Sequence, residues 1–63
     1  MNELLGIKQI GAFVGLNDHA GYWYSSQGRL PEPDMTNGTR RFWFTFTIAE
    51  WAKENAVGKY KFL

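Results

Sequence analysis

No cysteine occurs in this chain of 63 residues, and that absence limits how it can fold more than any other feature. Disulfide bonds, thiolate nucleophiles and cysteine zinc sites are excluded. A single histidine cannot form a histidine metal cluster, so we expect neither a metal nor a cofactor. A small domain without such cross-links depends on its packed core. Three Trp, three Tyr and five Phe can supply that core, because an aromatic side chain buries about 150–250 Å².

The formal net charge of +1 differs from the strongly basic balance of proteins that bind nucleic acids without sequence preference. Electrostatic binding must therefore depend on where the charges lie. The chain has no apolar run of about 18 residues and no signal-peptide pattern, so we expect a cytoplasmic protein without a membrane span. It also has no evident nucleophile–base pair or phosphate loop, and we expect that it is not an enzyme.

Residues 4–15 have the pattern of an amphipathic helix. The apolar positions with helical spacing are Leu4, Ile7, Ile10 and Val14. Gly6 can serve as the N-cap, with Gln9 in the capping-box position. Gly15 can end the helix, because glycine enters the left-handed region without a Cβ clash.

A second helix is predicted from a cap at Asn17 or Asp18 to about Gln27, with Gly28 after its end. Tyr22 and Trp23 are adjacent, so they cannot both face inward on a helix, and we expect one of them to contact a partner, either DNA or protein.

Pro31 and Pro33 exclude a helix from the next segment. Asn37–Gly38 then predicts a type I′ hairpin turn between residues 34–36 and 39–44. Within the second strand, Trp43 is expected in the core.

The third helix is predicted from a capping box formed by Thr47 and Glu50. Phe46 and Trp51 would form a hydrophobic staple across this helix start, with Trp51 in the core. Gly58 would end the helix region. Residues 59–63 alternate between charged and apolar side chains, and we expect a short third strand, or a flexible or partner-binding tail.

Two helices, a hairpin and a closing helix are the order of a winged helix-turn-helix, so we expect one α+β domain of that class over residues 1–63. Gly11 supports this interpretation, because the second helix of the motif crosses close above a small residue. The alternative is an ordinary pair of packed helices beside a hairpin.

The chain also resembles the AlpA/excisionase group of DNA-binding proteins from phages and mobile elements, which is related to the MerR-type winged helix. The resemblance covers about residues 4–54. It consists of the segment from Leu4 to Gly15, Gly28-Arg-Leu-Pro31 with Pro33 after it, Arg40-Arg41 followed by Trp43, and Trp51 in the helix after the wing.

This resemblance implies that residues 18–27 enter the major groove of double-stranded DNA and that the hairpin lies on the backbone or in the minor groove. The DNA-contacting residues would be His19, Tyr22, Trp23, Ser26, Arg40 and Arg41. It implies a transcription regulator or an excisionase-type directionality factor in the cytoplasm of a bacterial host. An integrase or another phage protein is a further expected partner.

Two departures from the family bear on binding. Residues 17–27 contain no Arg or Lys, and Gly21 stands where the family usually has a branched apolar residue. One copy should therefore bind weakly, and we expect a homodimer or a cooperative array. The alternative is a protein-interaction module on the same fold, such as an anti-repressor or a small-terminase-like assembly factor. For His19, the alternative to a DNA contact is an exposed side chain. For Arg40 and Arg41, the alternative is an ordinary solvated turn.

Overall fold

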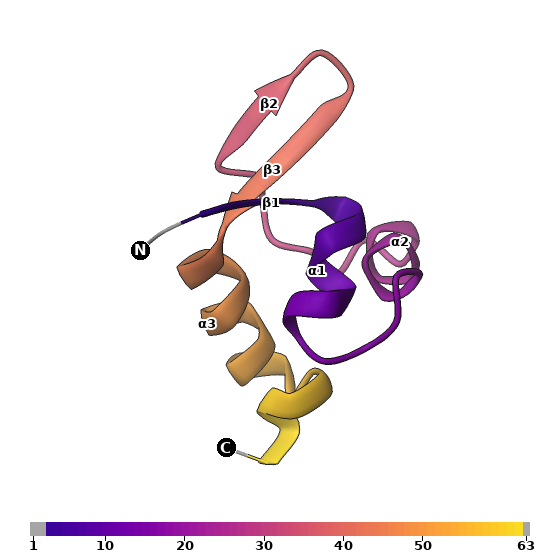
Figure 1. Cartoon of the computed structure of the whole chain (residues 1–63), viewed down its shortest axis with the longest axis vertical. Helices are drawn as coiled ribbons and strands as arrows, with labels where there is room; N and C mark the ends of the chain where they lie inside the picture. The colour runs from indigo at the N-terminus through magenta and orange to yellow at the C-terminus, as the bar shows by residue number, and fades with distance from the viewer. Residues whose placement is uncertain (1–2, 63) are drawn as a thin grey trace.

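The computed structural model describes residues 3–62, which form a small α+β fold with a winged-helix arrangement (Figure 1). Within these residues the elements are β1 (Leu4–Gly6), α1 (Ile7–Phe13), α2 (Ala20–Ser26), β2 (Met35–Asn37), β3 (Arg40–Phe44), α3 (Thr45–Asn55) and the short 3₁₀ helix η1 (Gly58–Phe62). The predicted order of two helices, a hairpin and a closing helix is confirmed, with β1 and η1 added to it.

The three strands form one antiparallel sheet in the order β1-β3-β2. Leu4, counted above in the helical stripe, lies instead in β1 opposite Phe44. Gly6 is the N-cap of α1 as predicted, and its N–H donates to Oε1 of Gln9 over 2.7 Å. The chain therefore changes from strand to helix at Gly6, directly beside β3.

Both helices of the N-terminal pair end at a glycine, as predicted. Gly15 has a φ of 84° and Gly28 a φ of 66°, both in the left-handed region. The N–H of Leu16 donates to the carbonyl of Gly11 over 2.7 Å, which closes the end of α1. The second helix starts later than predicted, at Ala20, because residues 17–19 form a turn before it.

The two helices are held close together by glycines. A Cβ atom on Gly11 would overlap the backbone carbonyl of Asn17, and one on Gly21 would overlap the carbonyl of Ile7. Glycine is a poor helix former, but the contact between α1 and α2 requires Gly21.

The hairpin is confirmed, with its turn one residue further along than predicted. Asn37 pairs with Arg40, so Gly38 and Thr39 form the two-residue loop. Gly38 has a φ of 63° and Thr39 does not have a positive φ, which excludes the predicted type I′ turn and matches type II′.

The start of α3 differs from the prediction, since Phe44 is the N-cap and Thr47 lies inside the first turn. The capping box of Thr47 with Glu50 is therefore wrong. The N–H of Phe44 donates to Oδ2 of Asp34 over 3.0 Å, and the N–H of Thr45 donates to the carbonyl of Glu3 over 2.9 Å. Acceptors from distant parts of the chain thus satisfy the start of the helix.

The predicted staple is also wrong. Phe46 is 47% exposed, and its ring is stacked on that of Phe44, with 5.7 Å between centroids. Trp51 is nevertheless buried, as expected for a core residue.

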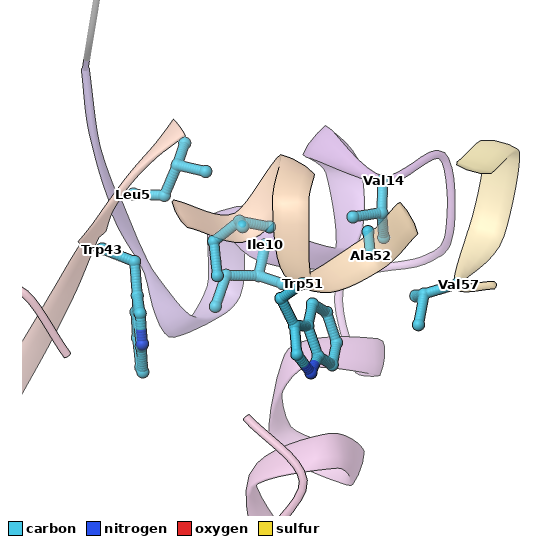
Figure 2. Packing of buried hydrophobic residues seen from close by; sticks show 8 residues of the cluster. Leu5, Ile10, Val14, Trp43, Trp51, Ala52 and Val57 are labelled. Carbon is cyan, nitrogen blue, oxygen red and sulfur yellow. The ribbon is translucent and has the colours of Figure 1, made fainter. Parts of the chain in front are cut away.

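The core lies between the sheet and the helices (Figure 2). Its buried side chains are Leu5, Ile10, Val14, Trp43, Ile48, Trp51, Ala52 and Val57. Nε1 of Trp43 donates to the carbonyl of Pro31 over 2.9 Å, and Nε1 of Trp51 donates to that of Arg29 over 2.8 Å. The two tryptophans therefore fix the segment that connects α2 to the hairpin, and their predicted place in the core is confirmed.

Residues 58–62 form η1 and not the third strand considered above. The N–H of Lys59 donates to the carbonyl of Val14 over 2.8 Å, which holds η1 against the end of α1. Residue 63 lies outside the described residues. Across residues 3–62, no helix has the length and apolar character needed to cross a membrane.

Candidate nucleic-acid interface

A groove lies between the hairpin tip, the first turn of α1 and the exposed side of α2. We call it the α2–hairpin groove. Its polar and aromatic lining includes Lys8, Tyr22, Ser25, Ser26, Arg40 and Arg41. In Figure 1, the hairpin projects from one end of the molecule and α3 runs toward the opposite end.

The lining of this groove is positively charged. Lys8 and Arg40 are exposed, as is Arg41, and none of the described residues that line the groove is Asp or Glu. A chain with a net charge of only +1 thus places three of its seven Lys and Arg residues around one groove. Such clustering creates a local positive potential that the net charge does not reveal.

Arg41 connects the hairpin to α2. Its Nη2 donates to Oγ of Ser25 over 2.8 Å, and its guanidinium lies 5.6 Å from the centroid of the buried Trp43 ring. These two contacts restrict the guanidinium and set the position of the hairpin relative to the helix.

Arg40 has a different environment. Its side chain is exposed and has no hydrogen-bond or ion-pair partner among the described residues. Because strand side chains alternate, it leaves β3 on the opposite face from Arg41, although both residues border the groove. The guanidinium of Arg41 is therefore restricted by its contacts, whereas that of Arg40 is available to a ligand.

Tyr22 and Ser26 are the predicted residues of α2 that line the groove. Tyr22 is 51% exposed. The hydroxyl of Ser26 donates to the carbonyl of Trp23 over 2.7 Å, so both lone pairs of its oxygen can still accept hydrogen bonds.

His19 and Trp23 lie elsewhere, in a shallow hollow that also includes Leu16 and Tyr24. The Trp23 ring packs edge-on against Tyr24, with 4.9 Å between centroids, and the Arg29 guanidinium lies 5.9 Å from it. Four of the six predicted contact residues thus surround the groove, while these two face a separate surface.

Lys8 was missed by sequence reasoning. It is the only Lys or Arg among the first 28 residues, and its place directly after Ile7 puts it outside the apolar stripe. An isolated positive charge outside the apolar stripe was the sequence feature that could have indicated Lys8 as a candidate contact residue.

No family model, curated protein or solved structure matches this chain.

Proposed function

We propose that this protein binds double-stranded DNA through the α2–hairpin groove. The observation that carries this proposal is the cluster of Lys8, Arg40 and Arg41 around a groove beside an exposed helix. Phosphate contacts by Lys and Arg supply most of the affinity of a protein for DNA.

In this proposal α2 enters the major groove and the hairpin lies along the adjacent backbone or minor groove. Tyr22 and Ser26 face base edges or the sugar backbone, while Arg40 and Lys8 contact phosphates. Arg41 holds the hairpin in place through Ser25 and makes the third phosphate contact of this surface. Since α2 contains no Lys or Arg, one copy binds weakly.

Following the resemblance to the AlpA/excisionase group, we propose that the DNA-bound protein regulates transcription or directs excision of a phage or mobile element in a bacterial cytoplasm. Both roles require recognition of a duplex site and work through cooperative binding beside other proteins, an integrase among them.

A fluorescence anisotropy titration tests DNA binding. The full chain is titrated into a labelled duplex taken from DNA beside its own gene, at several salt concentrations. Three phosphate contacts give a slope of about −2.7 in log affinity against log salt. A slope near zero, or no binding at low salt, would contradict the proposal.

A second candidate function is supported by the hollow beside α2. Trp23 is 51% exposed and Leu16 is 40% exposed, and both line this hollow. We propose as the alternative that this hollow binds a protein partner. A pulldown from the host that loses its partner with Trp23→Ala, but keeps it with Arg40→Ala plus Arg41→Ala, favours the alternative; the opposite result favours DNA.

A further inference from the structure

The face of the sheet that points away from the core carries a continuous apolar strip. Trp43 and Leu5 face the core, so their strand neighbours face outward. Leu4 is opposite Phe44, and Met35 is opposite Phe42, which places all four on this outer face. The Phe46 ring extends the strip, because it is stacked on Phe44 with an angle of 10° between the planes. We call these five residues the outer sheet patch.

The described chain leaves much of this patch uncovered. Leu4 is 38% exposed, Met35 50% and Phe46 47%. Together with the half-buried Phe42 and Phe44, they present on the order of 300–400 Å² of apolar surface. That is the size of the largest apolar patch on a typical monomer, and such patches often bind a partner. The patch shares only Phe42 with the lining of the α2–hairpin groove, and none of its five residues lines the hollow at Trp23. The functions above therefore leave most of the patch unexplained.

We propose that the outer sheet patch binds a second copy of this chain. The two copies are related by a twofold axis, with their β3 strands antiparallel across the interface. Charge supports this arrangement. Arg40 lies at the hairpin end of the strip, and Glu50 lies at the other end, one helical turn after Phe46 on the same side of α3. The twofold axis brings Arg40 of each copy toward Glu50 of the other.

The small area of the interface indicates a weak dimer. Two such patches bury roughly 700 Å² in total, less than the approximately 1,200 Å² of a stable interface. The dimer therefore dissociates at low concentration. It forms readily when two copies are held close together. The self-association depends on the outer face of the sheet and the start of α3, and it can be measured without DNA.

Sedimentation equilibrium of the full chain without DNA, over a wide concentration range, tests the proposal. We expect the mean mass to rise from 7.3 kDa toward twice that value and to stop there, because a twofold interface is closed. Phe46→Glu should weaken the dimer by about tenfold or more, since each dimer contains the change twice. Trp23→Glu is the matched control, because it removes an equally exposed ring from another face, and it should leave the dimer unchanged.

A charge exchange tests the orientation. Arg40→Glu and Glu50→Arg should each weaken the dimer, and the double variant should restore it. A wild-type mass that stays monomeric at every concentration would overturn the proposal. So would equal effects of Phe46→Glu and Trp23→Glu, or a double variant weaker than both single ones. If the dimer forms but no duplex DNA binds, the proposed function fails and this inference stands.

Discussion

Gly21→Ala is expected to remove most of the stability of the fold. The added methyl group would overlap the backbone carbonyl of Ile7, which cannot move without displacing α1. Overpacking in a core costs about 1–3 kcal/mol, and overlap with backbone costs more. The total stability of a small domain is only about 5–15 kcal/mol. Alanine is the better helix former by about 1 kcal/mol, so any loss arises from the helix contact.

Urea unfolding followed by tryptophan fluorescence measures this effect. Gly6→Ala is the matched control, because a Cβ there meets Oε1 of Gln9 at 3.4 Å and the Phe42 ring at 4.0 Å, both ordinary contacts. We expect the control to stay within about 1 kcal/mol of the wild type. Equal stability of the two variants would show that Gly21 does not lie against the carbonyl of Ile7.

Lys8→Gln combined with Arg40→Gln is expected to weaken binding to duplex DNA roughly 50-fold at about 0.1 M salt. Each phosphate contact contributes about −0.9 to the salt slope, so losing two contacts reduces the slope from about −2.7 to about −0.9. Both side chains are exposed, and the folded structure should not depend on them.

Lys53→Glu is the control for this double variant. It changes the net charge by the same amount, but it lies near the end of α3 and away from the groove. We expect it to change affinity only slightly, as measured by the same anisotropy titration. Similar losses in the control and the double variant would mean that overall charge, and not this groove, determines binding.

The features predicted correctly from the sequence depend on local chemistry. Gly15 and Gly28 end their helices, because a left-handed residue is needed there whatever the rest of the chain does. Trp43 and Trp51 are buried, because large apolar rings dominate so small a core.

The features predicted wrongly depend on distant partners. Strand β1 exists because residues 4–6 pair with residues 42–44, which no local pattern reveals. The capping box at Thr47 failed because Asp34 and the carbonyl of Glu3 already satisfy the start of α3. The family pattern favours a branched apolar residue at position 21, but the packing of α1 against α2 requires a residue without a side chain there.

Only part of the candidate site could be predicted, because its assembly also depends on contacts between distant parts of the chain. Tyr22, Ser26, Arg40 and Arg41 do line one groove. Trp23 follows Tyr22 along the helix and therefore points about 100° away from it, toward the separate hollow that also holds His19. Lys8 joins the groove only because β1 places the first turn of α1 beside the hairpin.

An NMR titration of the full chain with a short duplex tests most directly whether the α2–hairpin groove binds DNA. Amide chemical shifts should change in α2, in residues 39–41 and in the first turn of α1, while those of α3 and η1 stay nearly constant. Shifts confined to α3 and η1, or no shifts with duplex in excess at low salt, would contradict the account.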